Sequence, residues 1–170
     1  MNDGRTALVV VLPKADAALA AFRGRHDPAV TAGVPAHVTL LAPFAPLASI
    51  EAGELERLYA EEAPFDVALD RVDCFPEHVW LAPEPRRRFL DLIEATVDRF
   101  PDHPPYGGIF DGHVPHVTIA AGCDPTGLVR AARDELADGL PIYDRASAVT
   151  LFEQRDERWH ARGSFPFCDR

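Results

Sequence analysis

The stretch Val34–Leu40 (VPAHVTL) has a shortened copy later in the chain, Val114–Ile119 (VPHVTI). Each copy begins with a Val-Pro turn signal and continues with His, Val, Thr and an aliphatic residue. Side chains alternate between the two faces of a β-strand. Each copy therefore predicts a strand whose apolar residues face a core, while its histidine and threonine share the opposite face.

The elements on either side of the two copies occur in the same order, which is strand, helix, H-V-T strand, helix and strand. We expect strands at about 6–13, 37–44, 65–72, 78–82, 116–121, 146–153 and 159–167, and helices at 16–25, 49–61, 85–100 and 125–136. Asp16 is the expected N-cap of the first helix. This order predicts one domain, residues 1–170, built from pseudo-repeats at about 5–73 and 74–167. The class is α+β or an α/β sandwich, with two lobes around a cleft.

Charge and composition narrow the range of partners. The chain has 17 basic and 27 acidic residues, a net charge of −10 with neutral histidines. A long polyanion is repelled by such a chain, so we expect no duplex DNA partner, whereas a small nucleotide or an RNA 3′-end needs only a few positive groups. The early apolar run, Ala7–Leu12, is too short to span a bilayer.

Three cysteines without a CxxC pair favour free thiols, and we expect no secretory leader at the start of this sequence. These features predict a cytoplasmic protein that is not bound to a membrane, and we also expect a monomer.

The four polar motif residues, His37, Thr39, His116 and Thr118, suit acid–base chemistry on a phosphodiester. A neutral imidazole can remove a proton from the attacking oxygen while an imidazolium protonates the leaving oxygen, because the ordinary histidine pKa is about 6.5. Threonine hydroxyls can donate hydrogen bonds to the non-bridging oxygens. Neither motif has a second histidine or a carboxylate two positions on, so we expect no metal and no cofactor.

The tandem motifs and the duplicated layout resemble the two-histidine phosphoesterase superfamily. The chain is most similar in these motifs to bacterial RNA 2′,3′-cyclic phosphodiesterases, often called 2′-5′ RNA ligases. The resemblance implies an α+β bilobal fold with antiparallel sheets lining a central cleft. It also implies hydrolysis of a 2′,3′-cyclic phosphate to a 2′-phosphate. By the usual assignment in the family, His37 is the acid and His116 the base.

Two alternatives to this function remain open at the level of sequence. One is hydrolysis or ligation of a 2′-5′ phosphodiester in RNA, and the other is nucleotide or RNA binding without turnover. Binding alone does not require two matching imidazoles, so the intact motifs favour an enzyme.

Two further residues are candidates for substrate binding. Phe44 follows the first motif and can stack a base, as cleft aromatics do in the family, or it can belong to the core. Arg162 belongs to an arginine-rich hairpin and can grip a phosphate or lie on a solvated face. Trp80 and Tyr106 are weaker candidates for the same stacking role.

Overall fold

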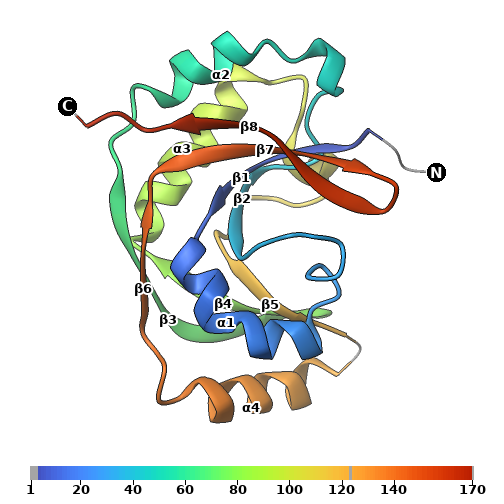
Figure 1. Cartoon of the computed structure of the whole chain (residues 1–170), viewed down its shortest axis with the longest axis vertical. Helices are drawn as coiled ribbons and strands as arrows, with labels where there is room; N and C mark the ends of the chain where they lie inside the picture. Colours follow the sequence, from blue (N-terminus) through green and yellow to red (C-terminus); the bar gives the residue numbers. More distant parts are fainter. Residues whose placement is uncertain (1–3, 123, 170) are drawn as a thin grey trace.

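The computed structural model describes residues 4–122 and 124–169. Over these residues it has an α+β fold with four α-helices and two antiparallel sheets of four strands each, which confirms the predicted class (Figure 1). The strands are β1 (Thr6–Val11), β2 (His37–Leu41), β3 (Phe65–Phe75), β4 (His78–Glu84), β5 (Val117–Ala121), β6 (Ile142–Ala146), β7 (Ala148–Arg155) and β8 (Arg158–Pro166). The helices are α1 (Pro13–His26), α2 (Ala52–Tyr59), α3 (Arg86–Arg99) and α4 (Pro125–Leu136), with short 3₁₀ turns η1 (Leu47–Ser49) and η2 (Pro105–Gly108).

The two halves of the chain exchange strands. The first sheet has the order β2-β1-β7-β8 and the second has the order β5-β4-β3-β6. Each sheet therefore combines strands from both halves, and the expected repeat boundary near residue 73 falls inside β3. The strand that carries each motif, β2 or β5, forms one edge of its sheet.

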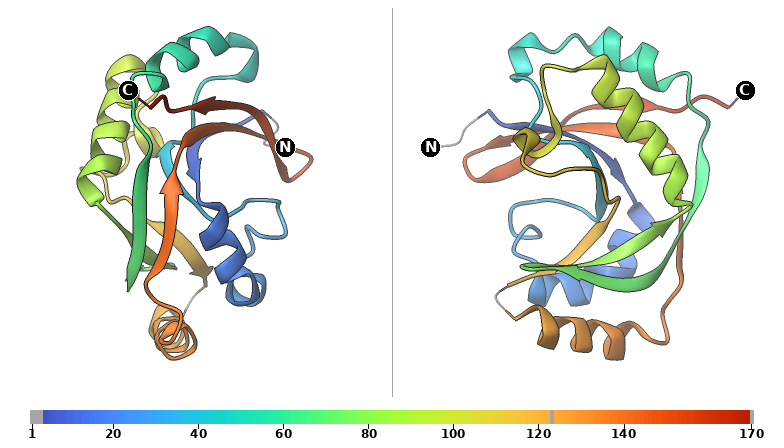
Figure 2. Two further views of the ribbon diagram at one scale, coloured as in Figure 1. Left: turned by 60° about the vertical axis from the view of Figure 1, so that its left-hand side comes forward. Right: turned by 180° about the vertical axis from the view of Figure 1, so that it is seen from behind.

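Helices cover one face of each sheet. Helices α2 and α3 contact the first sheet through β8 and β2, and α1 and α4 contact the second sheet (Figures 1 and 2). The main core joins buried side chains of both sheets and all four helices. Strand β1 (TALVVV) is apolar from Ala7 to Val11, because its neighbours bury both of its faces.

The beginning of α1 differs from the sequence expectation. The helix starts at Pro13, and Leu12 rather than Asp16 is its N-cap residue. Proline suits this first position because its fixed φ and missing N–H cost the helix nothing there. A free backbone amide of the first turn, Ala15 N–H, is capped from β6, where Asp144 Oδ2 accepts it at 2.9 Å.

Strand β6 was not expected, because it is short and a polar residue, Asp144, takes one of its buried positions. Cys74 and Cys168 are free and exposed, and Cys123 lies outside the described residues. Within 4–122 and 124–169, no helix has the length and apolar character needed to cross a membrane.

Candidate active site

The first motif occupies β2. His37 and Thr39 pair with Val11 and Val9 of β1 in the strand register. Both motif side chains are partly exposed, whereas Val38 between them is fully buried. The front face of this strand therefore carries the imidazole and the hydroxyl, and its back face belongs to the core.

The second motif has the same arrangement at β5. His116 immediately precedes the strand, and Thr118 pairs with Trp80 of β4. His116 and Thr118 are partly exposed, and Val117 between them is fully buried. The two motifs thus repeat the same local structure in different sheets.

The motif strands meet where the two sheets approach each other. Some Cα atoms of β2 lie within 8 Å of Cα atoms of β5. The charge of His116 also lowers the pKa of His37, so the two imidazoles lie within electrostatic reach of each other. Residues from separate halves of the sequence are in this way brought into one region.

Both imidazoles make the same hydrogen bond to the chain that leads into them. His37 Nδ1 lies 2.7 Å from the carbonyl oxygen of Pro35, and His116 Nδ1 lies 2.7 Å from that of Val114. A carbonyl oxygen can only accept, so Nδ1 carries the hydrogen in both rings. The lone pair of each neutral ring is therefore on Nε2, the nitrogen available to exchange a proton with a ligand.

Both histidines have a pKa below the ordinary value of 6.5. Burial is the main cause in each ring, and the hydrogen bond to the backbone acts in the opposite direction. The nearby charge of Arg23 lowers the pKa of His37 further and Asp27 raises it, whereas His78 lowers that of His116. These environments favour neutral imidazole, and an anion bound between the rings raises both pKa values by stabilising the charged forms.

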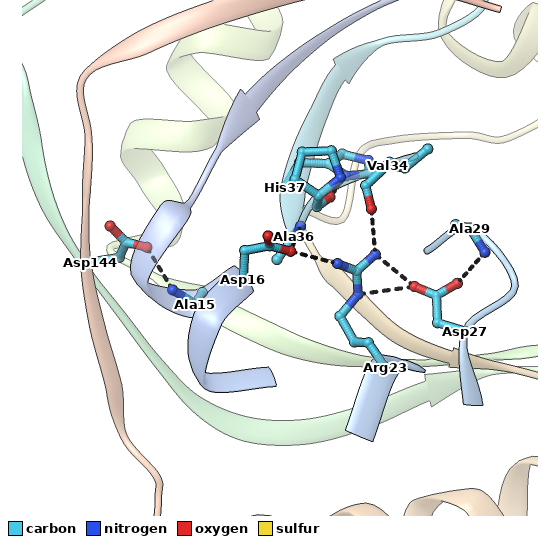
Figure 3. A network of polar contacts seen from close by, with 10 residues as sticks. Ala15, Asp16, Arg23, Asp27, Ala29, Val34, Ala36, His37 and Asp144 are labelled. Atoms are coloured by element: carbon cyan, nitrogen blue, oxygen red, sulfur yellow. Dashed lines mark hydrogen bonds and ion pairs between the residues drawn. The ribbon is translucent and has the colours of Figure 1, made fainter. Parts of the chain in front are cut away.

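The surroundings of His37 are charged. Arg23 of α1 is only 2% exposed and forms ion pairs with Asp16 at 3.0 Å and Asp27 at 2.9 Å (Figure 3). This network lies against residues 27–36, the loop that leads into His37. The first motif is therefore joined directly to a buried ion-pair cluster.

The surroundings of His116 are aromatic. The Phe75 ring lies 5.0 Å from the imidazole in an edge-on arrangement, and the Trp80 ring lies 5.9 Å from it, measured between centroids. Trp80 is 5% exposed, and its indole Nε1–H has no hydrogen-bond partner within the described part of the chain. The second motif therefore rests on apolar rings.

A hollow adjoins each motif. One, of about 480 Å³, is lined by the Val-Pro pair that precedes His37, and the other, of about 400 Å³, by the Val-Pro pair that precedes His116. Aromatic rings and arginines contribute to the second hollow, namely Phe75, Trp80, Arg71 and Arg86.

The two other candidate residues are engaged elsewhere. Phe44 is 7% exposed and lies in the main core, with its ring 4.9 Å from that of Phe100. Arg162 donates from Nε to the buried carboxylate of Glu153 at 2.8 Å. Neither contact is with the histidines or the threonines, so the candidate site consists of the four motif residues.

Sequence reasoning did not identify the roles of Arg23 and Phe75 or of the two carbonyls. The Val-Pro pair before each histidine was a visible signal for the carbonyls, because in both copies the accepting carbonyl belongs to this pair and lies two residues before the ring. Arg23 is separated from His37 by a loop, and Phe75 reaches His116 only through the pairing of β3, β4 and β5. Their positions follow from tertiary structure.

Comparison with known proteins identifies the class. A sequence model described as the 2′-5′ RNA ligase superfamily matches residues 11–158, and the chain therefore belongs to this family of two-histidine phosphoesterases. No curated protein sequence matches the chain.

Solved structures with a similar fold share little sequence with the chain. E. coli LigT complexed with 3′-AMP matches with a TM-score of 0.64 and 18% identity, over 99% of this chain and 100% of LigT. TT0787 of Thermus thermophilus matches with a TM-score of 0.66 and 19% identity, over 95% of this chain and 97% of that protein. E. coli LigT complexed with NADP+ matches with a TM-score of 0.59 and 17% identity, over 99% and 100%. At these identities the likeness establishes the fold.

Proposed function

We propose that the protein hydrolyses the 2′,3′-cyclic phosphate of nucleotides or RNA ends to a 2′-phosphate, with His37 and His116 as acid and base and without a metal. The observation that carries the proposal is the pair of partly exposed imidazoles with matching Nδ1–H bonds to the backbone. That pairing leaves two Nε2 atoms for one proton donation and one proton removal. The membership of the family supports a phosphodiesterase or ligase activity in general.

The proposed reaction is an in-line displacement at phosphorus. Neutral His116 accepts at Nε2 a proton from water, whose oxygen forms a bond to phosphorus. The bond from phosphorus to the 3′-oxygen breaks as protonated His37 donates from Nε2 to that oxygen. The products are a 2′-phosphate and a free 3′-hydroxyl, and exchange with solvent returns each ring to its starting state.

Protonation of the proposed acid, His37, requires the negative charge of the bound substrate. In the free protein both histidine pKa values are lowered, chiefly by burial, so both rings favour the neutral form. The phosphodiester supplies a negative charge that stabilises one imidazolium, and the proximity of the two rings disfavours a second. The bound site therefore holds one imidazolium and one neutral imidazole, as the mechanism needs.

The two threonines complete the proposed site. Thr39 and Thr118 lie on the same strand faces as the histidines. Their hydroxyls are proposed to donate to the non-bridging oxygens, where negative charge grows in the transition state. Nucleotide binding is also consistent with the fold, since LigT has been crystallised with 3′-AMP and ATP.

The direct test is chromatography of a nucleoside 2′,3′-cyclic phosphate after incubation with the protein in EDTA. Wild-type protein is expected to form the 2′-nucleotide, and His116→Ala to lower turnover about 10²–10⁴-fold. Equal turnover by the two pure proteins contradicts the proposal. Recovery of tightly bound but unchanged substrate assigns the protein to nucleotide binding without turnover.

A second candidate keeps the site and changes the substrate to a 2′-5′ phosphodiester in RNA, which is hydrolysed or formed. The description of the matching family favours it. A panel that contains a 2′,3′-cyclic nucleotide, a 2′-5′ dinucleotide and an RNA pair to be joined decides between the candidates. Turnover of only one class eliminates the others.

A further inference from the structure

Arg23 is the centre of a polar network that ends beside His37. Its Nε and Nη2 donate to Asp27 Oδ2 at 3.0 and 2.9 Å, and its Nη1 donates to Asp16 Oδ1 at 3.0 Å. The guanidinium is buried, with 3% of its side chain exposed, as is the Asp27 carboxylate. Among the described residues, no ion pair involves the segment 101–115 that leads into His116.

The network binds the chain on both sides of Pro35. Arg23 Nη2 donates to the carbonyl of Val34 at 3.1 Å, one residue before Pro35. Asp16 Oδ1, which accepts from Arg23, also accepts the backbone N–H of Ala36 at 2.8 Å, one residue after it. The Pro35 carbonyl, which accepts the Nδ1–H bond of His37, belongs to the same peptide group as the Ala36 N–H that Asp16 holds, and Arg23 holds the preceding peptide group at the Val34 carbonyl.

The network also fixes the beginning of this loop. Asp27 Oδ1 accepts the backbone N–H of Ala29 at 3.0 Å, while Oδ2 is held by Arg23. The Arg23 side chain thus holds both ends of the loop 27–36, the first through Asp27 and the second through Val34. Figure 3 shows these bonds meeting at its guanidinium.

We infer that Arg23 is a positioning residue for His37, which sets the Pro35 carbonyl and through it the ring orientation and the Nδ1–H tautomer. The inference rests on the proposed role of His37. A fixed tautomer presents Nε2 to the substrate, and small displacements of a reacting group cost large factors in rate.

A purely stabilising role explains this network less well. Buried ion pairs contribute little net stability, because the cost of removing both charges from water offsets their attraction. A planar guanidinium with several donors does suit the simultaneous binding of two carboxylates and a carbonyl, which a lysine ammonium cannot reproduce in the same geometry. The location of the network at the approach to His37 therefore indicates geometric control.

The charges of the network act on His37 as well. The charged and titratable groups that influence the ring are Arg23, Asp27 and His116. Loss of the Arg23 charge removes a cause of the lowered pKa and leaves the Asp27 carboxylate, which raises it. A change at Arg23 that removes its charge therefore moves the pH profile in a predictable direction, toward higher pH for the limb that reports His37.

The test compares Arg23→Lys with Arg25→Lys. Arg25 lies on the same helix and pairs with Glu135, but its side chain is 55% exposed. Arg23→Lys is expected to lower kcat about 10–100-fold with a smaller change in KM. It is also expected to populate the Nε2–H tautomer of His37 in ¹⁵N NMR spectra without substrate. Arg25→Lys is expected to retain both wild-type properties.

Asp16→Ala provides a second variant, because the Asp16 side chain is 43% exposed and its loss leaves the buried Arg23–Asp27 pair intact. It removes the acceptor of Ala36 N–H and is expected to act in the same direction as Arg23→Lys.

Wild-type kcat and an unchanged His37 tautomer in folded variants overturn the inference, as does a rise in KM alone. The tautomer spectra need no turnover. An inactive wild-type protein with altered tautomers in the variants therefore contradicts the proposed function and leaves the positioning role supported.

Discussion

The two motifs have nearly the same sequence and the same hydrogen bond, yet they lie in opposite environments. His37 lies next to a buried network of one arginine and two carboxylates. His116 lies against the rings of Phe75 and Trp80. The backbone bond gives both rings the same tautomer, while the neighbours determine how each ring responds to charge.

Under the proposed mechanism, this difference lets two copies of one motif take distinct proton-transfer roles. A charged network can hold a ring in place and adjust its pKa in either direction, because it contains both signs of charge. An aromatic wall excludes water and disfavours the charged ring. The two halves can therefore separate the roles of acid and base without any change in the motif itself.

The largest effect is expected from removing either imidazole. His37→Ala and His116→Ala are each expected to lower kcat/KM about 10²–10⁴-fold, and the double variant to fall by less than the product of the single losses, because both rings act in one step. The measurement is steady-state hydrolysis of a 2′,3′-cyclic nucleotide.

His160→Ala is the control for these variants. His160 is exposed and pairs in register with Glu153 of β7. It is expected to retain wild-type activity, and a loss equal to that of His116→Ala contradicts the assignment of the two catalytic histidines.

Arg23→Met tests the charged surroundings of His37. The change leaves the Asp27 carboxylate, with 3% of its side chain exposed, without its partner, and is expected to cost about 3–5 kcal/mol of unfolding free energy. Arg23→Met combined with Asp27→Asn removes both charges and is expected to regain part of that loss. Urea unfolding measures both values, and a single-variant cost below about 1 kcal/mol contradicts the description of a buried network.

Trp80→Phe tests the aromatic surroundings of His116. Phenylalanine keeps an aromatic ring next to His116 and removes an indole N–H that is buried without a partner in the described chain. Loss of an unsatisfied donor offsets part of the lost packing, so the expected change in unfolding free energy is within about 1 kcal/mol. Trp80→Ala is the matched variant that removes the ring, and it is expected to cost about 3–5 kcal/mol. Equal losses from the two variants contradict this explanation.

The smallest effect is a dependence of stability on pH. Both motif histidines have a folded-state pKa below 6.5, so near that pH the unfolded chain binds more protons than the folded one. Stability is therefore full above pH 6.5 and declines as the pH falls toward the folded-state values. Replacement of both histidines by asparagine is expected to weaken this decline, measured by urea unfolding between pH 7.5 and 5.5. An identical decline in the two proteins contradicts the lowered pKa values.

Much of the fold was predictable because its signals are local. The continuous apolar run of β1, the amphipathic pattern of α3 and the Pro125 start of α4 each specify an element from a few neighbouring residues. Strand β6 was missed because Asp144 and Arg145 interrupt its apolar residues, and burial of Asp144 depends on the N-terminus of α1. The pairing of strands from different halves depends on contacts between residues far apart in the sequence, and no local pattern encodes these contacts.

The site was predictable only in part for a similar reason. His37, Thr39, His116 and Thr118 repeat at matching positions, so the sequence itself marks them. The hydrogen bonds that set the tautomers involve backbone carbonyls, which every residue has. The different surroundings of the two rings come from residues outside the motifs, at α1 for His37 and on the strands β3 and β4 for His116.

The most direct test of the central claim is an NMR titration of both imidazoles with a nucleoside 2′-monophosphate. If the two rings face a single phosphoryl group, the ¹⁵N resonances of His37 and His116 shift together along one saturation curve, and both pKa values rise on binding. If one ring remains unchanged at saturation, or if the two rings follow different curves, the histidines do not act on one phosphorus atom.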